Sequence, residues 1–205
     1  MPDIDYFYST RSIYAYFGAK RIAEIARRAG RRLVHKPVDL SKVVPAFAGA
    51  GFEARTPKQR AYYFGREIER WSQFLGVPAL VDPSHHYGDR TLPSGFVIAA
   101  QRLAPAQVDA LHLAVLEALW RFDRDIADRA VLADLARGVG ADPAPLLDVA
   151  LSDDVQAEFA RNSAEAIERG VPGSPTYVAD GEVFYGQDHL AMLERHLATP
   201  FKPGV

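Results

Sequence analysis

Residues 9–12, which read Ser-Thr-Arg-Ser, lie where an expected strand passes into an expected helix. The N–H groups of a helix's first turn, together with the positive end of its dipole, favour the binding of an anion or a thiolate. A hydroxyl of Ser9, Thr10 or Ser12 could therefore donate a hydrogen bond to a thiolate here. The same hydroxyl could equally serve as the N-cap of the helix, and the spacing alone does not choose between the two roles.

Two further polar segments lie near the C-terminal end of the sequence. Ser174 and Pro175 directly precede an expected strand, where a proline is tolerated because it need not donate to the strand ladder. Gln187 and Asp188 open the last expected helix, where a carboxylate is favoured by the helix dipole. Asp188 could equally bind the cationic amine of a small ligand at the same end of the sheet.

A metal site is not expected from the histidines. His85 and His86 lie close to Asp82 and Asp89 in the sequence. Adjacent histidines point in different directions, however, and the sequence contains no His pair at i, i+4. We therefore predict a solvated loop at these residues and no bound metal.

The composition of the chain excludes several kinds of chemistry. The 205 residues include no cysteine, and 24 Lys and Arg nearly balance 26 Asp and Glu. Without cysteine, the protein has no disulfide, thiolate zinc site, iron–sulfur cluster, cysteine nucleophile or C-x-x-C redox pair. The near-neutral charge argues against nucleic-acid binding, and no apolar run is long enough to span a membrane. We expect a cytoplasmic protein that binds neither nucleic acid nor a membrane.

The N-terminal elements that must position residues 9–12 follow from hydrophobic periodicity. Residues 4–8 are rich in aromatic and β-branched side chains, which predicts a strand. Apolar residues then recur at steps of three to five between Tyr14 and Ala29, which predicts an amphipathic helix that ends at Gly30. Residues 31–38 predict a second strand. A strand, a helix and a strand within forty residues form a βαβ unit with parallel strands.

The remaining sequence divides into a helical region and a C-terminal ββα unit. From residue 40 to 169 the periodicity is helical, with no strand pattern, and the predicted helices span residues 62–75, 93–103, 106–122, 130–139 and 154–167. Asp180 and Gly181 separate two β-rich runs, residues 176–179 and 182–185, and so predict a type I′ hairpin. A last helix is predicted at residues 187–197.

The aromatic residues of the helical region are expected to lie on apolar faces. Core packing is the default interpretation for each of them, although some could line a pocket for a flat substrate. These residues are Tyr62, Tyr63, Phe64, Trp71 and Trp120.

This order of elements predicts an α/β fold: a thioredoxin-like four-stranded sheet core (βαβ…ββα) with a large all-helical insertion. The predicted thioredoxin-like domain comprises residues 1–39 plus 171–205, and the helical insertion comprises residues 40–170. That fold places a cis-proline opposite the N-terminus of its first helix, so we expect Pro175 to be cis. The site that holds a thiol in this fold is then kept while the chain has no thiol of its own, and Ser12 is placed to receive one from outside.

The sequence also resembles a known family across nearly its whole length. It is similar to the 2-hydroxychromene-2-carboxylate isomerases and the related kappa-class glutathione transferases, within the thioredoxin-like superfamily that includes the DsbA-type oxidoreductases. The segments that carry this resemblance are residues 5–9, 12–17, 60–62, 69–71, 125–128, 131–132, 173–176, 180–182 and 186–188.

The resemblance implies that the protein uses glutathione. Ser12 then stands where the family places the serine that replaces the redox cysteine and hydrogen-bonds the glutathione sulfur. Ser174, before the expected cis-Pro175, would pair its backbone with the cysteinyl unit. Gln187 and Asp188 would hold the γ-glutamyl end.

The resemblance further implies a reaction and an assembly. The glutathione thiolate would add reversibly to the conjugated double bond of an aromatic hydroxychromene or benzylidenepyruvate acid, the adduct would rotate, and elimination would return glutathione. Lys58 or Arg60 would supply a cationic contact to glutathione, while Arg11, His85 or His86 could hold the substrate carboxylate. Relatives of the kappa type also imply a homodimer.

Two other functions stay open at this level. The same Ser12 would serve a kappa-like glutathione transferase or peroxidase that conjugates or reduces its substrate. A cysteine-free thioredoxin-like module could instead bind a peptide or a partner protein without catalysis.

Overall fold

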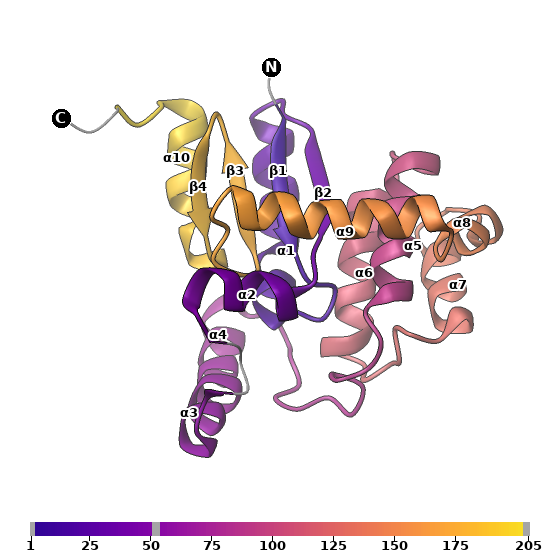
Figure 1. Ribbon diagram of the computed structural model, residues 1–205, viewed down its shortest axis with the longest axis horizontal. Coiled ribbons are helices and arrows are strands. Elements are labelled where there is room, and N and C mark those ends of the chain that lie inside the picture. The colour runs from indigo at the N-terminus through magenta and orange to yellow at the C-terminus, as the bar shows by residue number, and fades with distance from the viewer. Residues whose placement is uncertain (1–2, 51–53, 203–205) are drawn as a thin grey trace.

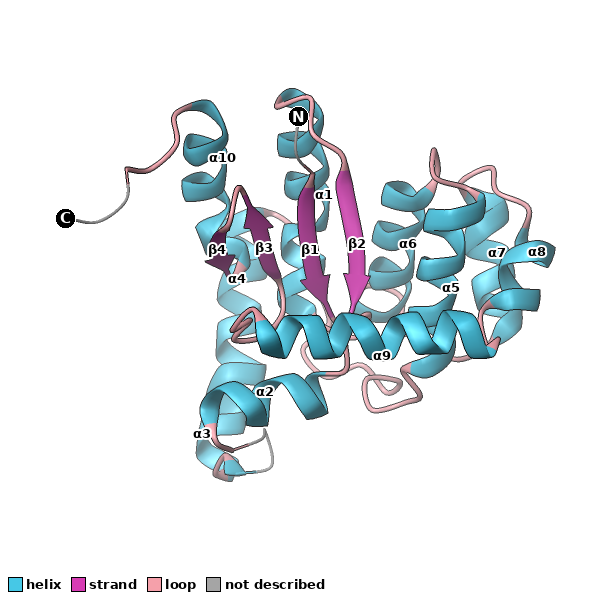
Figure 2. Ribbon diagram, turned by 45° about the horizontal axis from the view of Figure 1, so that its top comes forward, coloured by secondary structure: helices cyan, strands magenta, loops and turns pink. Residues whose placement is uncertain are grey.

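A mixed four-stranded sheet forms the centre of the molecule, and the computed structural model describes residues 3–50 and 54–202 (Figure 1). Strand β1, Ile4–Tyr8, pairs in parallel with β2, Leu33–Pro37. Strand β3, Thr176–Ala179, pairs antiparallel with β1, and β4, Glu182–Tyr185, pairs with β3. The strand order is therefore β2-β1-β3-β4, and the opposite directions of β1 and β3 are visible in Figure 2. The predicted fold class is confirmed.

Local sequence explains the two connections that frame this sheet. Helix α1, Ile13–Arg28, links β1 to β2 and buries Ile13, Phe17 and Ile22, which lie at the predicted apolar spacing. Between β3 and β4, Asp180 and Gly181 have φ angles of 53° and 89°, and a type I′ turn requires a positive φ at both of these positions. The predicted βαβ unit and hairpin are both confirmed.

Helices make up the remaining described elements, and their bounds differ from the predicted ones in places. The expected helix at residues 62–75 is a π-helical turn followed by an α-helix, because the backbone hydrogen bonds lengthen to an i+5 spacing there. The expected last helix begins with a 3-10 turn. The sequence pattern did not delimit three short helices, at residues 40–48, 57–61 and 143–149. In chain order the elements are α2 (Leu40–Ala48), α3 (Pro57–Ala61), η2 (Tyr62–Arg66), α4 (Glu67–Leu75), α5 (Thr91–Leu103), α6 (Val108–Trp120), α7 (Arg129–Gly138), α8 (Pro143–Val149), α9 (Asp153–Glu168), η3 (Gln187–His189) and α10 (Leu190–Ala198).

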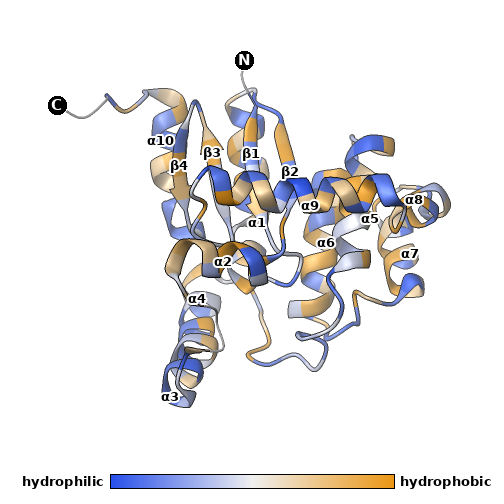
Figure 3. Ribbon diagram, in the orientation of Figure 1, coloured by the Kyte–Doolittle hydropathy of each residue, from blue (hydrophilic) through white to orange (hydrophobic). Residues whose placement is uncertain are grey.

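The sheet separates two hydrophobic clusters. On one face Phe7 and Val178 pack with Val43 of α2 and Ala166 of α9, and α9 crosses this face in Figure 1. Orange and blue segments alternate along α9 in Figure 3, as expected for a helix with one apolar side. The larger cluster lies on the face of α1 and continues without interruption through α6 to α7 and α8.

The predicted core packing of the aromatic residues is confirmed for one of them and wrong for two. Trp120 is fully buried, and Phe64 and Trp71 are half-buried against the main cluster. Tyr62 and Tyr63 are 48% and 51% exposed. They lie on the arm formed by α3, η2 and α4, which projects away from the sheet in Figure 1, so the body of the protein does not cover them.

No helix in the described part of the chain is long and apolar enough to cross a membrane.

The packing of α5 against α8 and α9 generates a first prediction. A Cβ atom at Gly95 would lie 2.0 Å from the Ala150 carbonyl oxygen and 2.7 Å from Gln156 Nε2. Gly95→Ala should therefore lower the free energy of unfolding by about 2 kcal/mol or more, because overpacking outweighs the gain of roughly 0.5–1 kcal/mol that alanine brings to a helix. Urea unfolding followed by circular dichroism measures this change.

The matched control is Gly138→Ala at the end of α7, where the added Cβ would meet no described atom within 4 Å. That variant should be as stable as the wild type or more stable. Equal effects of the two substitutions would contradict the prediction.

Candidate functional site

Ser12 is the N-cap of α1, and its hydroxyl also reaches the C-terminal half of the chain. Its Oγ accepts a hydrogen bond from the Ala15 N–H at 3.2 Å and donates one to the Ser174 carbonyl at 3.3 Å. The capping role left open by the sequence is therefore real. Because the Oγ lies at the first turn of α1, a ligand anion at this place would meet both the hydroxyl and the helix dipole.

The segment opposite Ser12 is held by its own hydrogen bonds. The Ser174–Pro175 peptide bond is cis, as predicted. The Ser174 Oγ accepts a hydrogen bond from the Ser9 N–H at 3.0 Å, so two contacts join residues 9–12 to residue 174. The Ser174 N–H donates to no acceptor in the described part of the chain, which leaves it able to pair with an added backbone.

The start of η3 lies beside the same segment. The Gly186 N–H donates to the Pro175 carbonyl at 2.8 Å, which ties the turn before Gln187 to the cis-proline. Gln187 is buried, and its side-chain oxygen accepts from Arg21 at 3.4 Å. Asp188 is half-exposed, with an oxygen 3.6 Å from His189 Nδ1. Gln187 therefore faces the protein, whereas the Asp188 carboxylate faces solvent near the site.

Tyr14, Tyr185 and the cation Arg55 form a second group of polar side chains. Burial, with a smaller effect of Glu67, raises the pKa of Tyr14 to about 12, and burial also raises the pKa of Tyr185. Arg55 opposes both shifts, so its guanidinium lies close enough to act on both hydroxyls. Arg55 also packs over the ring of Phe64 at 5.2 Å. No local sequence pattern sets Arg55 apart from Lys58, so this cation could not be identified from the sequence.

A cleft of about 350 Å³ opens between the arm and the loop that follows α4. Its lining includes Arg60, Phe64, His86, Tyr87 and the buried Trp120. The rings of His86 and Trp120 meet edge to face at 4.7 Å, and the indole N–H of Trp120 has no partner among the described residues. The aromatic residues of this wall suit a flat aromatic ligand.

The two predicted cations, Lys58 and Arg60, lie on the exposed helix α3. Arg60 lines the aromatic cleft, while Lys58 is exposed and its ammonium group forms no hydrogen bond or ion pair with the described residues. In the described structure neither side chain forms a hydrogen bond or ion pair with Ser12 or Ser174, so the two cations lie outside the contact between these serines.

Arg11 does not fill the role considered for it as a contact to a substrate carboxylate. It is only 4% exposed, and its N–H groups donate to the carbonyl oxygens of His85, His86 and Asp89. Burial first, and then the Arg11 charge, lower the pKa of His86. His86 is therefore a neutral side chain of the cleft wall. No group of three potential metal ligands gathers among the described residues.

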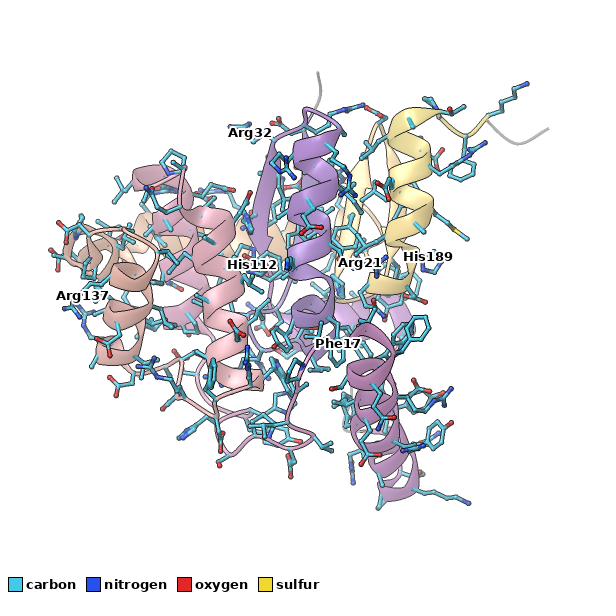
Figure 4. The ribbon with its side chains drawn as sticks, turned by 180° about the vertical axis from the view of Figure 1, so that it is seen from behind. Phe17, Arg21, Arg32, His112, Arg137 and His189 are labelled. Carbon is cyan, nitrogen blue, oxygen red and sulfur yellow. The ribbon has the colours of Figure 1, made fainter. Side chains whose placement is uncertain are left out.

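A buried polar cluster lies beneath the site and was not recognised in the sequence. The Tyr8 hydroxyl is 3.1 Å from His35 Nδ1, and His35 Nε2 is 2.8 Å from Asp109. His112 Nε2 lies 3.2 Å from the Tyr6 hydroxyl, and Figure 4 shows His112 on α6 beside α1. The cluster could not be found from sequence because its members come from three elements.

A larger groove of about 500 Å³ runs between α1, β2 and α6, and it includes none of the predicted site residues. Two of its cations are already engaged, Arg31 by Asp180 and Arg32 by Asp3. The smaller cleft, which Arg11 connects to Ser12, is therefore the candidate for chemistry.

The family of the chain follows from comparison with known proteins. The model of the DSBA-like thioredoxin domain matches residues 3–198, and the chain belongs to this family. A 2-hydroxychromene-2-carboxylate isomerase of Sphingobium xenophagum is 26% identical over 200 residues, covering 95% of this chain and 97% of the relative. The isomerase of the same name from Pseudomonas putida is 27% identical over 191 residues, covering 93% and 92%.

Solved structures agree with this fold. A 2-hydroxychromene-2-carboxylate isomerase structure superposes with a TM-score of 0.79 at 24% identity, covering 97% of this chain and 95% of its own. The cytosolic disulfide reductase DsbM of Pseudomonas aeruginosa, solved with GSH, gives 0.67 at 21% identity, covering 98% and 94%. The resemblance predicted from the sequence segments is confirmed.

The buried histidines generate a prediction about pH. Burial, and the adjacent His35, hold the pKa of His112 well below its usual range. Below pH about 6.5 His112 is therefore protonated in the unfolded chain but stays neutral in the folded protein. The free energy of unfolding that this histidine contributes above that pH is lost as the pH falls. His112 should contribute a slope of up to about 1.4 kcal/mol per pH unit.

Urea unfolding of the wild type and of His112→Gln between pH 5 and pH 8 measures this contribution. The variant should show a shallower loss of stability below pH about 6.5 and a parallel curve above it. An unchanged slope in His112→Gln would show that this histidine is protonated in the folded protein.

Proposed function

We propose that this protein is a glutathione-dependent isomerase of the 2-hydroxychromene-2-carboxylate type. The observation that carries the proposal is the Ser12 hydroxyl, which is set at the N-terminus of α1 and against Ser174, in a chain without cysteine. Relatives that cover almost the whole chain bear the name of this isomerase, which supports the reaction class.

The residues around Ser12 fit a glutathione molecule. A sulfur beside the Ser12 Oγ would accept its hydroxyl hydrogen in place of the Ser174 carbonyl, and the unpartnered Ser174 N–H would pair with the cysteinyl backbone. The half-exposed Asp188 carboxylate suits the γ-glutamyl ammonium group. Gln187 would support this end of the site without touching glutathione through its side chain, because its buried amide faces α1.

Glutathione, when bound, would supply a thiolate whose reversible addition permits rotation about the double bond of a conjugated aromatic acid and leaves the thiol unchanged. The first turn of α1 and the Ser12 hydroxyl would favour the thiolate form by stabilising its charge. Tyr14 keeps its proton at neutral pH, since its pKa is about 12.

The aromatic cleft supports a place for the second substrate. Its wall of Phe64, His86 and Tyr87 suits a flat ring, and Arg60, which also lines the cleft, would supply a cation for a carboxylate. His86 would remain uncharged beside that ring because its pKa is lowered.

Ser12→Ala should reduce kcat/KM of the isomerisation by about 10- to 100-fold, because a hydrogen bond to a charged group contributes roughly 1.5–3 kcal/mol. It should also raise the apparent pKa of bound glutathione, read from the ultraviolet absorbance of its thiolate. Isomerisation of 2-hydroxychromene-2-carboxylate in the presence of glutathione provides the rate.

The control is Ser152→Ala. Ser152 also caps a helix, since its side chain accepts from the Val155 N–H at the start of α9. Both substitutions remove a cap and should cost about 1 kcal/mol of stability. Only the change at Ser12 should affect the thiolate, and equal activity of the two variants would contradict the assignment.

The same assay distinguishes the other two functions. A stable conjugate that accumulates with a model electrophile, or net consumption of glutathione with a peroxide, would replace the isomerase by a kappa-like transferase or peroxidase. A wild-type protein that neither binds glutathione nor shifts its pKa would be a non-catalytic binding module. Assembly as a homodimer and a cytoplasmic location remain predictions, and sedimentation analysis measures the first.

A further inference from the structure

Arg11 is a buried cation whose side-chain hydrogen bonds all go to backbone carbonyl oxygens of one loop in the described structure. Its Nε and Nη2 donate to the Asp89 carbonyl at 2.9 and 2.6 Å, and its Nη1 donates to the carbonyls of His85 and His86. The nearest carboxylate, that of Asp125, is 4.0 Å away. Burial lowers the pKa of Arg11, while Asp125 and Asp89 raise it. A guanidinium removed from water to this extent requires most of its donors to be engaged, and the carbonyl oxygens of one loop provide this.

The loop that Arg11 holds is the loop that lines the cleft. Val81, Asp82, His86 and Tyr87 form one wall, and the carbonyls bonded by Arg11 begin at His85. The backbone of Arg11 belongs to the turn that leads to Ser12, and its own N–H donates to Ser9 Oγ at 3.2 Å. One side chain therefore fixes the distance between the start of α1 and the wall of the cleft.

We propose that Arg11 is the positioning residue that holds the aromatic cleft in register with Ser12. It acts through the loop carbonyls and does not touch either substrate. This inference rests on the proposed function for its kinetic consequence, since the cleft is there assigned to the aromatic acid. Arg11 accordingly determines how well the second substrate is bound and has little influence on the binding of glutathione.

The geometry explains why an arginine stands at this position. Three carbonyl oxygens spread over five residues need several donors in one plane, which the guanidinium fork provides and an ammonium group does not. The loop approaches the fork closely at Gly88. A Cβ atom there would lie 2.6 Å from Arg11 Nη2 and 3.1 Å from its Cζ. Gly88 therefore leaves room for the guanidinium, although no positive φ requires a glycine.

The first test is Arg11→Met, which keeps an unbranched apolar stem and removes the donors. We expect KM for 2-hydroxychromene-2-carboxylate to rise by about tenfold or more, as the loss of charged hydrogen bonds implies, while the dissociation constant of glutathione changes less than about twofold. Arg11→Lys, which keeps the charge, should recover only part of the loss. Equal weakening of the binding of the aromatic acid and of glutathione in Arg11→Met would overturn the proposal. A wild-type KM in Arg11→Lys would also overturn it.

The second test approaches the same contact from the loop. Gly88→Ala leaves the charge and Ser12 unchanged but pushes the exposed loop away from the guanidinium. It should raise KM for the aromatic acid in the same direction as Arg11→Met, and it keeps the proposal falsifiable if Arg11→Met fails to fold. An unchanged KM in Gly88→Ala would overturn the proposal.

The matched control is Arg137→Met on α7. Arg137 is exposed, its guanidinium pairs with Asp134 three residues earlier, and Figure 4 shows it on the side of the molecule away from α4. Its KM and glutathione binding should match those of the wild type.

Hydrogen exchange separates this inference from the proposed function. Amides of residues 84–90 should exchange faster in Arg11→Met and in Gly88→Ala than in Arg137→Met, whether or not the wild type isomerises the acid. If these two variants exchange faster and the wild-type protein does not isomerise the acid, the proposed function is refuted and the loop-positioning role of Arg11 is retained. Unchanged exchange in both variants would refute the role of Arg11 itself.

Discussion

The contact between residues 9–12 and the cis-proline segment is the constraint on which the site depends. Two hydrogen bonds, from Ser9 N–H and from Ser12 Oγ, reach Ser174 across 165 and 162 residues of sequence. The antiparallel pairing of β1 and β3, with Tyr6 opposite Tyr177, brings these segments together. The long helical region between them must therefore leave and return at the same end of the sheet, which is the end where α1 begins.

Polar groups of α5 and α6 stabilise the edge strand β2 next to this site. Gln101 of α5 donates to the His35 carbonyl and accepts from its N–H, so its amide pairs with the edge strand β2 as a neighbouring strand would. The His35 ring connects Asp109 to the Tyr8 hydroxyl. Because these groups satisfy one another, β2 is fixed to α5 and α6 by hydrogen bonds in addition to apolar packing.

The parts of the fold that sequence could predict are those encoded by neighbouring residues. The hairpin follows from Asp180 and Gly181, whose residue types permit the positive φ angles, and the strand before Ser9 follows from five consecutive side chains. The π-helical turn at Tyr62–Arg66 could not be predicted in this way. Its residues have ordinary helical spacing, and the change of hydrogen-bond pattern occurs inside the arm, where α3 passes into α4.

The same distinction applies to the candidate site. Ser12 and Ser174 could be named because each stands at a helix start or before a proline, and the structure joins them by a hydrogen bond. The positions of Arg11 and Trp120 in the structure could not be predicted. The loop carbonyls that Arg11 bonds lie 74–78 residues further along the chain, and Trp120, at the end of α6, meets His86 of the same loop. Nothing in residues 9–12 indicates that the Arg11 side chain turns inward.

The buried charge of Arg11 also has an electrostatic effect on the cleft. Carbonyl oxygens accept the hydrogen bonds of the guanidinium, and its nearest carboxylate, that of Asp125, lies 4.0 Å away and is partly exposed, so a positive charge that is solvated mainly by carbonyls lies near the start of α1. That charge opposes protonation of His86, and it adds to the positive end of the helix dipole in favouring an anion nearby. An arginine paired with a buried carboxylate would hold the loop equally well without this effect. The use of carbonyls therefore lets one side chain both support the cleft and keep its surroundings favourable to a thiolate.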